Sequence, residues 1–268
     1  MKQLTLSIVI PAYNEEMHLE RCLQAIAAQT TMPDEVIVVD NNSTDQTVKI
    51  ARQFPFVKVV QESRQGVLYA RNAGFEAARS DIIGRIDADT LLPPDWVAHL
   101  VRFYSAEAHR RYAWVGPCRF YNLPLPWLTS FLMRPIGFGI NRIVVGTNTL
   151  FGSNMALLRT QWQEVVANLC LRPDIHEDLD LAIHLHQAGY KTYFDRHMVV
   201  PAAMRSLHLR GRALWRYLQM WPRTLRVHGF AGWVLAEVTG VGLIYALFPI
   251  YVAVDWLGRR ARQVQPPQ

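Results

Sequence analysis

The chain has 268 residues, half of them hydrophobic and 19% charged, with 15 glycines and 15 prolines. This composition excludes an intrinsically disordered, collagen-like or low-complexity protein, and the length suits one large domain or two small ones. The net charge is +6, but long apolar runs interrupt the basic C-terminal stretch, which argues against a nucleic-acid partner.

Residues 4–120 alternate short apolar runs with amphipathic patterns. We expect strands at 6–10, 36–39, 56–60 and 82–86, and helices at 15–29, 44–54 and 67–79. Ser43 or Thr44 is the expected cap of the second helix. The first apolar run is too short for a secretion signal and leads straight into a polar helix start. The alternation predicts an α/β fold with an open, mostly parallel sheet flanked by helices.

Polar residues follow three of these strands. The first strand leads into Pro-Ala-Tyr-Asn-Glu at 11–15, the second into Asp-Asn-Asn-Ser at 40–43, and the fourth into Asp-Ala-Asp at 87–89. Ligands of such sheets bind beyond the carboxyl ends of the strands, so we expect a ligand crevice at this edge. Asp87 and Asp89 suit a Mg²⁺ or Mn²⁺ ion that also takes phosphate oxygens; two solvated turn aspartates are the alternative.

Other nucleotide-binding signatures are missing from the sequence. No GxxxxGK[ST] loop occurs and no GxGxxG follows a strand, which argues against a P-loop kinase and a nicotinamide dehydrogenase. The three cysteines are far apart and form no CxxC pair, so we expect neither a zinc cage nor a disulfide framework, and a reducing compartment fits. The histidines show no ligand spacing, and His184 and His186 suit surface or core positions.

The second half of the chain is less regular. Residues 121–150 are loop-like and rich in proline and aromatic residues, 150–158 predict a strand entering a helix, and another helix begins near His176. Glu177 and Asp178 are adjacent, so on a helix their side chains point about 100° apart and only one can face a ligand. Acidic residues at this point also favour a helix N-terminus through its dipole, which is the alternative to a catalytic role.

Several ordered segments together resemble a family-two glycosyltransferase with the GT-A fold. These segments are SIVIPAYNEE at 7–16, VVDNNSTDQT at 38–47, NAG at 72–74, DAD at 87–89, GSNMA at 152–156, and EDLDL at 177–181 with AGY at 188–190. The resemblance covers about residues 4–200. It implies transfer of a sugar from a nucleotide diphosphate sugar, usually UDP-linked, with inversion at the anomeric carbon.

The resemblance also implies roles for individual residues. Asp40 would hydrogen-bond the uracil, Asp87 would approach the ribose and the metal, and Asp89 would coordinate Mg²⁺ or Mn²⁺ at the diphosphate. Asp178 would be the general base that takes the proton of the acceptor hydroxyl, a poor nucleophile at neutral pH. The residues implied to contact the nucleotide are Pro11, Ala12, Tyr13, Glu15, Asp40, Arg71, Asn72 and Asp87.

The C-terminal quarter has a different character. Residues 196–268 hold ten arginines against two acidic residues, and 238–254 are 17 uncharged residues between Trp233 and Trp256. As a helix this run would be ~26 Å long, at the short end for a bilayer span. We expect a helix lying in the membrane interface or a re-entrant turn at Pro249, on the cytoplasmic face; a helix packed on the body is the alternative.

We therefore expect a GT-A catalytic domain at 1–200 and a membrane-associating extension at 201–268. The catalytic domain would divide into a nucleotide-sugar half at 1–120 and an acceptor half at 121–200. No QxxRW motif occurs, so processive polymer synthesis is not expected. His208, Arg210 and Arg212 would cover the diphosphate, supply a metal ligand or form a solvated basic face.

The expected acceptor is lipid-linked or a glycan near the membrane, as in cell-envelope synthesis. Arginine binds phosphate through a bidentate fork and tryptophan settles at headgroup depth, and both occur between Arg205 and His228. A soluble acceptor stays open. Two other functions compete: a non-catalytic nucleotide-sugar-binding scaffold, and a nucleotidyltransferase, which would normally carry a glycine-rich basic loop after the first strand.

Overall fold

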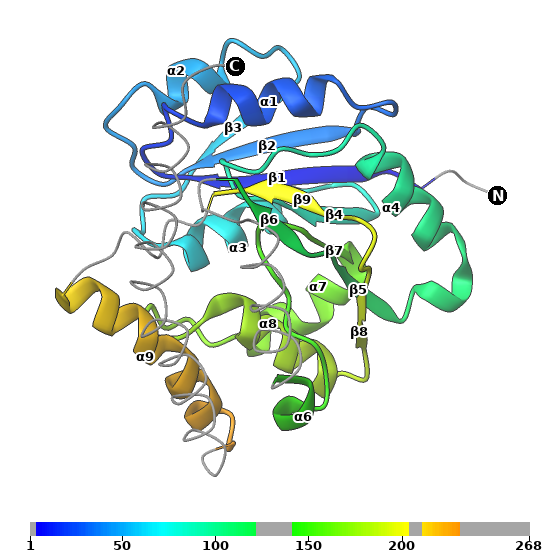
Figure 1. The fold of residues 1–268 in the computed structure, drawn as a ribbon, viewed down its shortest axis with the longest axis vertical. Coiled ribbons are helices and arrows are strands. Elements are labelled where there is room, and N and C mark those ends of the chain that lie inside the picture. The colour runs from blue at the N-terminus through cyan, green and yellow to red at the C-terminus, as the bar shows by residue number, and fades with distance from the viewer. Residues whose placement is uncertain (1–3, 122–140, 204–210, 231–268) are drawn as a thin grey trace, which may run out of the picture.

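The computed structural model describes residues 4–121, 141–203 and 211–230. Its centre is a seven-stranded sheet in the order β3-β2-β1-β4-β7-β5-β8, and β6 and β9 form a second sheet of two strands (Figure 1). The strands are β1 (Leu6–Ala12), β2 (Glu35–Asp40), β3 (Val57–Gln61), β4 (Ile82–Arg85), β5 (Tyr112–Val115), β6 (Cys118–Phe120), β7 (Met155–Leu158), β8 (Lys191–Phe194) and β9 (Val200–Ala202).

The large sheet is mostly parallel. Strands β1 to β4 pair in parallel, as do β5 and β8, whereas β7 runs antiparallel to both of its neighbours, β4 and β5. The antiparallel pairing brings the start of β7 beside the carboxyl end of β4, with Met155 opposite Arg85. The residues just before β7 therefore join the ligand edge that the first four strands create.

Helices cover both faces of the sheet (Figure 1). Ile8 and Ile10 pack with α1, α2 and α4, and Val9 and Ile37 pack with α3, α7 and α8 on the other face. Burial on both faces explains the unbroken apolar runs of β1 and β2. The helices are α1 (Leu19–Ala27), α2 (Thr47–Ala51), α3 (Val67–Ala77), α4 (Trp96–Ser105), α6 (Asn141–Val145), α7 (Arg159–Val165), α8 (Glu177–Gln187) and α9 (Gly211–Val227).

The first four strands and three helices occur in the predicted order, but two helices are shorter than the sequence pattern suggests. Helix α1 starts at Leu19, since residues 15–18 form a turn in which the backbone carbonyl of Glu15 accepts the backbone N–H of His18 at 3.0 Å. The expected cap of α2 at Ser43 or Thr44 is wrong. Asp45 instead accepts the backbone N–H of Thr47 at 2.9 Å, so the helix begins later.

Helix α9 packs on α8 through a small third core. Leu225 of α9 contacts Leu179 and Ile183 of α8, and the hydroxyl of Thr224 accepts the backbone N–H of His176 at 2.8 Å. Among the described helices, none combines the length and the apolar character that crossing a bilayer requires. The 238–254 segment and the His208 and Arg210 positions lie outside the described residues, and the domain boundaries at 120 and 200 stay predictions.

Candidate active site

The ends of β1 and β2 lie side by side at the expected ligand edge. Ala12 and Asp40 are register partners in the parallel pairing, and Pro11 pairs with Val39. The Asp40 side chain is buried, and its Oδ1 accepts the backbone N–H of Ser43 at 3.2 Å. Tyr13 follows Ala12 and is 49% exposed, so its ring is available at the rim of this edge.

Hydrogen bonds join the loop after β1 to the loop after β2. Asn14 has a φ of 53°, a left-handed conformation that asparagine tolerates better than most residues. Its backbone N–H donates to the hydroxyl of Ser43 at 3.0 Å, and its Oδ1 accepts the backbone N–H of Thr44 at 2.8 Å. The buried Glu15 donates its backbone N–H to the hydroxyl of Thr47 at 2.7 Å. These hydrogen bonds hold the two loops together along the expected ligand edge.

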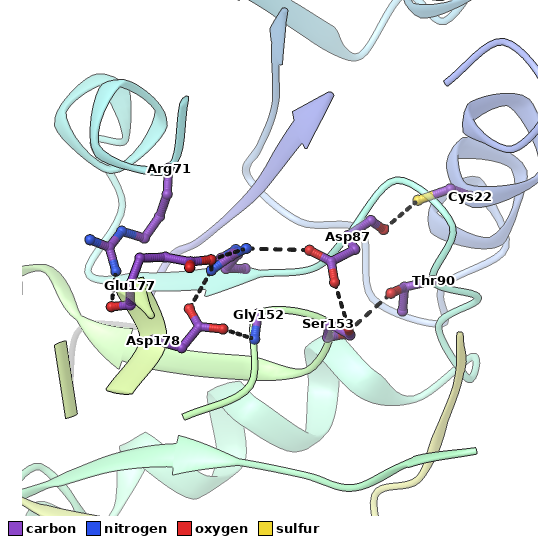
Figure 2. Close-up of polar contacts among 9 residues, drawn as sticks. Cys22, Arg71, Asp87, Thr90, Gly152, Ser153, Glu177 and Asp178 are labelled. Carbon is purple, nitrogen blue, oxygen red and sulfur yellow. Dashed lines mark hydrogen bonds and ion pairs between the residues drawn. The ribbon is translucent and has the colours of Figure 1, made fainter. Parts of the chain in front are cut away.

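Asp87 and Asp89 stand on a tight turn after β4, which is closed by the backbone N–H of Thr90 donating to the carbonyl of Asp87 at 3.0 Å. Oδ2 of Asp87 accepts the hydroxyl hydrogen of Ser153 at 2.5 Å, and its Oδ1 lies 3.4 Å from a guanidinium nitrogen of Arg85 (Figure 2). Asp89 is 2% exposed. The turn therefore presents one partly exposed and one buried carboxylate.

Arg85, the last residue of β4, is the charged centre of this site. Its guanidinium is buried and contacts three carboxylates. Nη1 donates to Oδ1 of Asp178, Nη2 lies 3.3 Å from Oε1 of Glu177, and Nη2 also lies 3.4 Å from Oδ1 of Asp87. Arg85 is not among the residues predicted from the sequence. The available signal was a charged residue at the end of an otherwise apolar strand.

Asp178 lies in the first turn of α8 and is held at both oxygens. Oδ1 accepts from Arg85, and Oδ2 accepts the backbone N–H of Gly152 at 2.8 Å (Figure 2). Adjacent positions on a helix predict that Glu177 and Asp178 point in different directions, but their carboxylates converge on one guanidinium. Both carboxylates contact the Arg85 guanidinium, Asp178 at Nη1 and Glu177 at Nη2.

The two adjacent carboxylates differ in proton affinity. Burial raises the pKa of Asp178 above the usual aspartate range, and the negative charge of Glu177 acts in the same direction against the opposing effect of Arg85. Burial also acts to raise the pKa of Glu177, but Arg85, His176 and Arg71 outweigh it and lower that pKa. Asp178 is therefore the member of the pair that takes up a proton first.

A second buried arginine, Arg71, contacts the backbone at the start of α8. It is fully buried in α3, and its Nη1 donates to the backbone carbonyl of Glu177 at 2.9 Å while its Nε donates to Oδ1 of Asn72 at 3.0 Å. Its guanidinium also lies over the ring of Trp162, 5.9 Å from the centroid. The observed contacts position Glu177, and nucleotide contact by Arg71 or Asn72 stays a prediction.

Comparison with known proteins identifies the family. Residues 7–164 match the model of glycosyl transferase family 2, which is more than half of the chain. The chain belongs to glycosyl transferase family 2. The resemblance seen in the sequence is confirmed, and so is the mostly parallel α/β sheet flanked by helices.

Two solved structures share the fold of this family 2 chain. One is a mannosyltransferase from Pyrobaculum calidifontis, solved with GDP-Man and Mn²⁺, with a TM-score of 0.61 at 21% identity. The match covers 99% of this chain and 82% of the mannosyltransferase chain. The other is S. aureus TarS 1–349 in complex with UDP-GlcNAc, with a TM-score of 0.60 at 17% identity. That match covers 84% of this chain and 65% of the TarS chain.

Curated relatives match a shorter region. Glycosyltransferase AglE of Haloferax volcanii is 37% identical over 98 residues, which is 34% of this chain and 32% of AglE. The chain spans about a third of the length of the first curated relatives it matches. The comparisons thus establish the family and the fold of the catalytic region.

Gly152 allows this family 2 site to close around Arg85. A Cβ atom at position 152 would lie 2.3 Å from Cζ of Arg85, which is well inside van der Waals contact. Glycine is therefore required for the close approach of this loop to the guanidinium, and its backbone N–H can then reach Asp178.

The donor atoms on the turn after β4 fit a hard divalent cation. Asp87 and Asp89 offer carboxylate oxygens, the donors that Mg²⁺ and Mn²⁺ prefer. The Cys22 thiol lies nearby and donates to the backbone carbonyl of Asp87 at 3.8 Å, and burial raises its pKa, which disfavours the thiolate that a metal would need. One face of Asp87 is already fixed by Ser153 and Arg85, so its carboxylate is oriented before any ion binds. Asp87 and Asp89 are the residues that would hold the metal.

Proposed function

We propose that this chain transfers a sugar from a nucleotide diphosphate sugar, with UDP as the expected nucleotide, to a hydroxyl or phosphate of an acceptor, with inversion. Asp178 acts as the general base, and Pro11, Ala12, Tyr13, Glu15 and Asp40 bind the nucleoside. The observation that carries the proposal is that one buried guanidinium, that of Arg85, contacts both the candidate base Asp178 and the candidate metal ligand Asp87.

This arrangement supports deprotonation next to the leaving group. The base must act on the acceptor at the anomeric carbon, which is attached to the diphosphate held near Asp87 and Asp89. Asp178 contacts Nη1 and Asp87 contacts Nη2 of the same Arg85 guanidinium. The candidate base and the candidate metal ligand are therefore separated by a single side chain. Positioned groups of this kind account for much of the rate of an enzyme because the reactants need no further ordering.

Asp178 has the properties of a base. Each carboxylate oxygen has two acceptor sites, so the bonds from Arg85 and Gly152 leave one site on each oxygen for an acceptor hydroxyl. The raised pKa of Asp178 strengthens its proton affinity, as a base requires, and the Arg85 guanidinium opposes that rise by favouring the charged form. A Mg²⁺ or Mn²⁺ ion at Asp87 and Asp89 would supply positive charge against the departing diphosphate.

We also propose that the acceptor is lipid-linked and that the protein works at the cytoplasmic face of the membrane in cell-envelope synthesis. Arg212, Trp215 and Arg216 of α9 share one helical face and are exposed, Trp215 by 64%. Basic side chains flanking a tryptophan favour anionic headgroups.

Flotation with vesicles containing phosphatidylglycerol tests this proposal. The double variant Trp215→Ala, Arg216→Ala is expected to lose flotation. The control variant Arg52→Ala is expected to float as the wild type does.

A donor screen tests the catalytic proposal. Purified protein is incubated with UDP- and GDP-sugars and either Mn²⁺ or Mg²⁺, and release of the nucleoside diphosphate is measured with an undecaprenyl phosphate or glycan acceptor. Sugar transfer supports the proposal. Donor binding without any transfer would favour the non-catalytic scaffold, and release of pyrophosphate would favour a nucleotidyltransferase.

A further inference from the structure

A second cluster of ionisable side chains lies where α8, α9 and the segment after α7 meet. Its members are Cys170, Asp180, His184 and His228, and one potential ligand atom from each lies within 4.8 Å of all the others. Asp180 is two residues after Asp178, which places the two carboxylates about 200° apart around α8. The cluster therefore faces away from Arg85 and belongs to the packing of α9 on α8.

Asp180 is the centre of the cluster and is fully buried. Its Oδ1 lies 2.8 Å from Nε2 of His228 and 3.5 Å from Nε2 of His184, and its Oδ2 accepts the backbone N–H of Cys170 at 3.2 Å. The Sγ atom of Cys170 is 4.0 Å from Nε2 of His228. Three segments that are separate in the sequence thus direct a sulfur, an oxygen and two nitrogens to one point.

Hydrogen bonding alone leaves part of this cluster unexplained. Nε2 of His184 is buried and makes no hydrogen bond within the described part of the chain, although it points to the Asp180 carboxylate. Ligands in a tetrahedral zinc site lie about 3.3–3.8 Å apart, given zinc bonds of about 2.0–2.3 Å. The 3.5 Å and 4.0 Å separations are close to that spacing. The 2.8 Å between Oδ1 of Asp180 and Nε2 of His228 is a hydrogen-bond distance, and these two atoms would move apart by about 0.5 Å around an ion.

The charge of the cluster suits a dication. A cysteine thiolate and an aspartate carboxylate together carry two negative charges, and two neutral imidazoles add none, so Zn²⁺ would make the buried group neutral. A buried carboxylate otherwise needs a positive partner, because desolvating an isolated charge is costly. Sulfur and imidazole ligands favour zinc over the hard ions that oxygen sites prefer, which separates this cluster from Asp87 and Asp89.

We propose that Cys170, Asp180, His184 and His228 bind one zinc ion, and that this ion fastens the end of α9 to α8. Four protein ligands would close the coordination sphere, as in structural rather than catalytic zinc sites. This proposal departs from the expectation, drawn from the sequence, that the chain holds no zinc cage. That expectation rested on spacing in the sequence, whereas these ligands come together only when α9 packs on α8.

Metal analysis tests the proposal without any activity assay. Full-length protein from zinc-supplemented medium, desalted into metal-free buffer, is expected to retain one zinc ion per chain by mass spectrometry. Asp89→Ala should retain it as well, which excludes the candidate active site as its location. Cys170→Ser and His228→Ala should weaken zinc binding by more than about 100-fold, while Cys118→Ser and His186→Ala should leave it unchanged.

Cobalt spectroscopy on the wild-type protein covers the case in which a ligand variant fails to fold. Co²⁺ added to zinc-free protein should give the strong visible bands of a four-coordinate ion and a thiolate-to-cobalt charge-transfer band. A wild-type chain that retains no zinc and shows neither feature would overturn the proposal. Zinc retained by folded Cys170→Ser and His228→Ala would overturn it too. Neither readout depends on sugar transfer, so this proposal and the proposed function fail separately.

Discussion

Arg85 and Asp178 form a buried ion pair between the last residue of β4 and the first turn of α8, with only 3% and 7% of their side chains exposed. Asp87 and Glu177 approach the same guanidinium. Three carboxylates around one arginine keep it charged, and burial alone would have had the opposite effect. This pair joins the end of β4 to the helix that carries the candidate base.

Replacing Arg85 with methionine is expected to destabilise the fold and abolish turnover. The change keeps an unbranched apolar stem but leaves the Glu177 and Asp178 carboxylates buried without a cation, which costs about 3–5 kcal/mol. Those carboxylates would then have raised pKa values in the folded state, so the folded protein would bind protons more tightly and lose stability as pH rises.

Urea unfolding at pH 5 and pH 8 measures this effect, with the exposed Arg52→Met as the matched control. The loss of unfolding free energy should be greater at pH 8 than at pH 5 in Arg85→Met and absent in Arg52→Met. Equal stability of Arg85→Met and the wild type at both pH values would show that the ion cluster is not formed.

The pH dependence of kcat/KM should report the proton affinity of Asp178. Burial and the Glu177 charge raise the pKa of Asp178, so activity should rise with pH through a limb above the usual aspartate value of about 4. In Glu177→Gln the neighbouring charge is gone, and the limb should move to lower pH. A limb at or below about 4 in the wild type, or one that moves upward in the variant, would contradict the assignment.

Gly152→Ala should impair the chemistry more than donor binding. Its Cβ would lie 2.3 Å from Cζ of Arg85, so the guanidinium or the loop must shift, and with it the N–H that donates to Asp178. A shift of about 1 Å in a catalytic group lowers kcat by about 100-fold. Steady-state kinetics and UDP calorimetry separate the two effects, and unchanged kcat would argue against a role for this contact.

Asp89→Ala should remove the metal dependence of nucleotide binding. Without this carboxylate the oxygen site loses a ligand, and adding Mn²⁺ should no longer tighten UDP binding in calorimetry. Asp95→Ala, an exposed carboxylate six positions later, is the control and should behave as the wild type. If Mn²⁺ tightens UDP binding equally in Asp89→Ala, the ion binds elsewhere.

Much of the structure up to β4 follows from local patterns in the sequence. Apolar runs and helical periodicity predict β1 to β4 with α1 to α3, and the parallel order of the strands brings Asp40 and Asp87 to one edge. Arg85 was not predicted because its position in an apolar strand says nothing of its partners, which come from residues after 150. The cluster at His184 and His228 was not predicted either, because its members come together only when α9 packs on α8 in the tertiary fold.

Asp178→Asn tests the central claim most directly. Asparagine keeps the size of the side chain and its bond from Gly152 but cannot take a proton from an acceptor hydroxyl. Turnover with the active donor is expected to fall by about 10²–10⁴-fold, the usual contribution of a general base, while calorimetric UDP affinity in Mn²⁺ stays near that of the wild type. Wild-type turnover in this variant would contradict the account, because Asp178 would then not be the base.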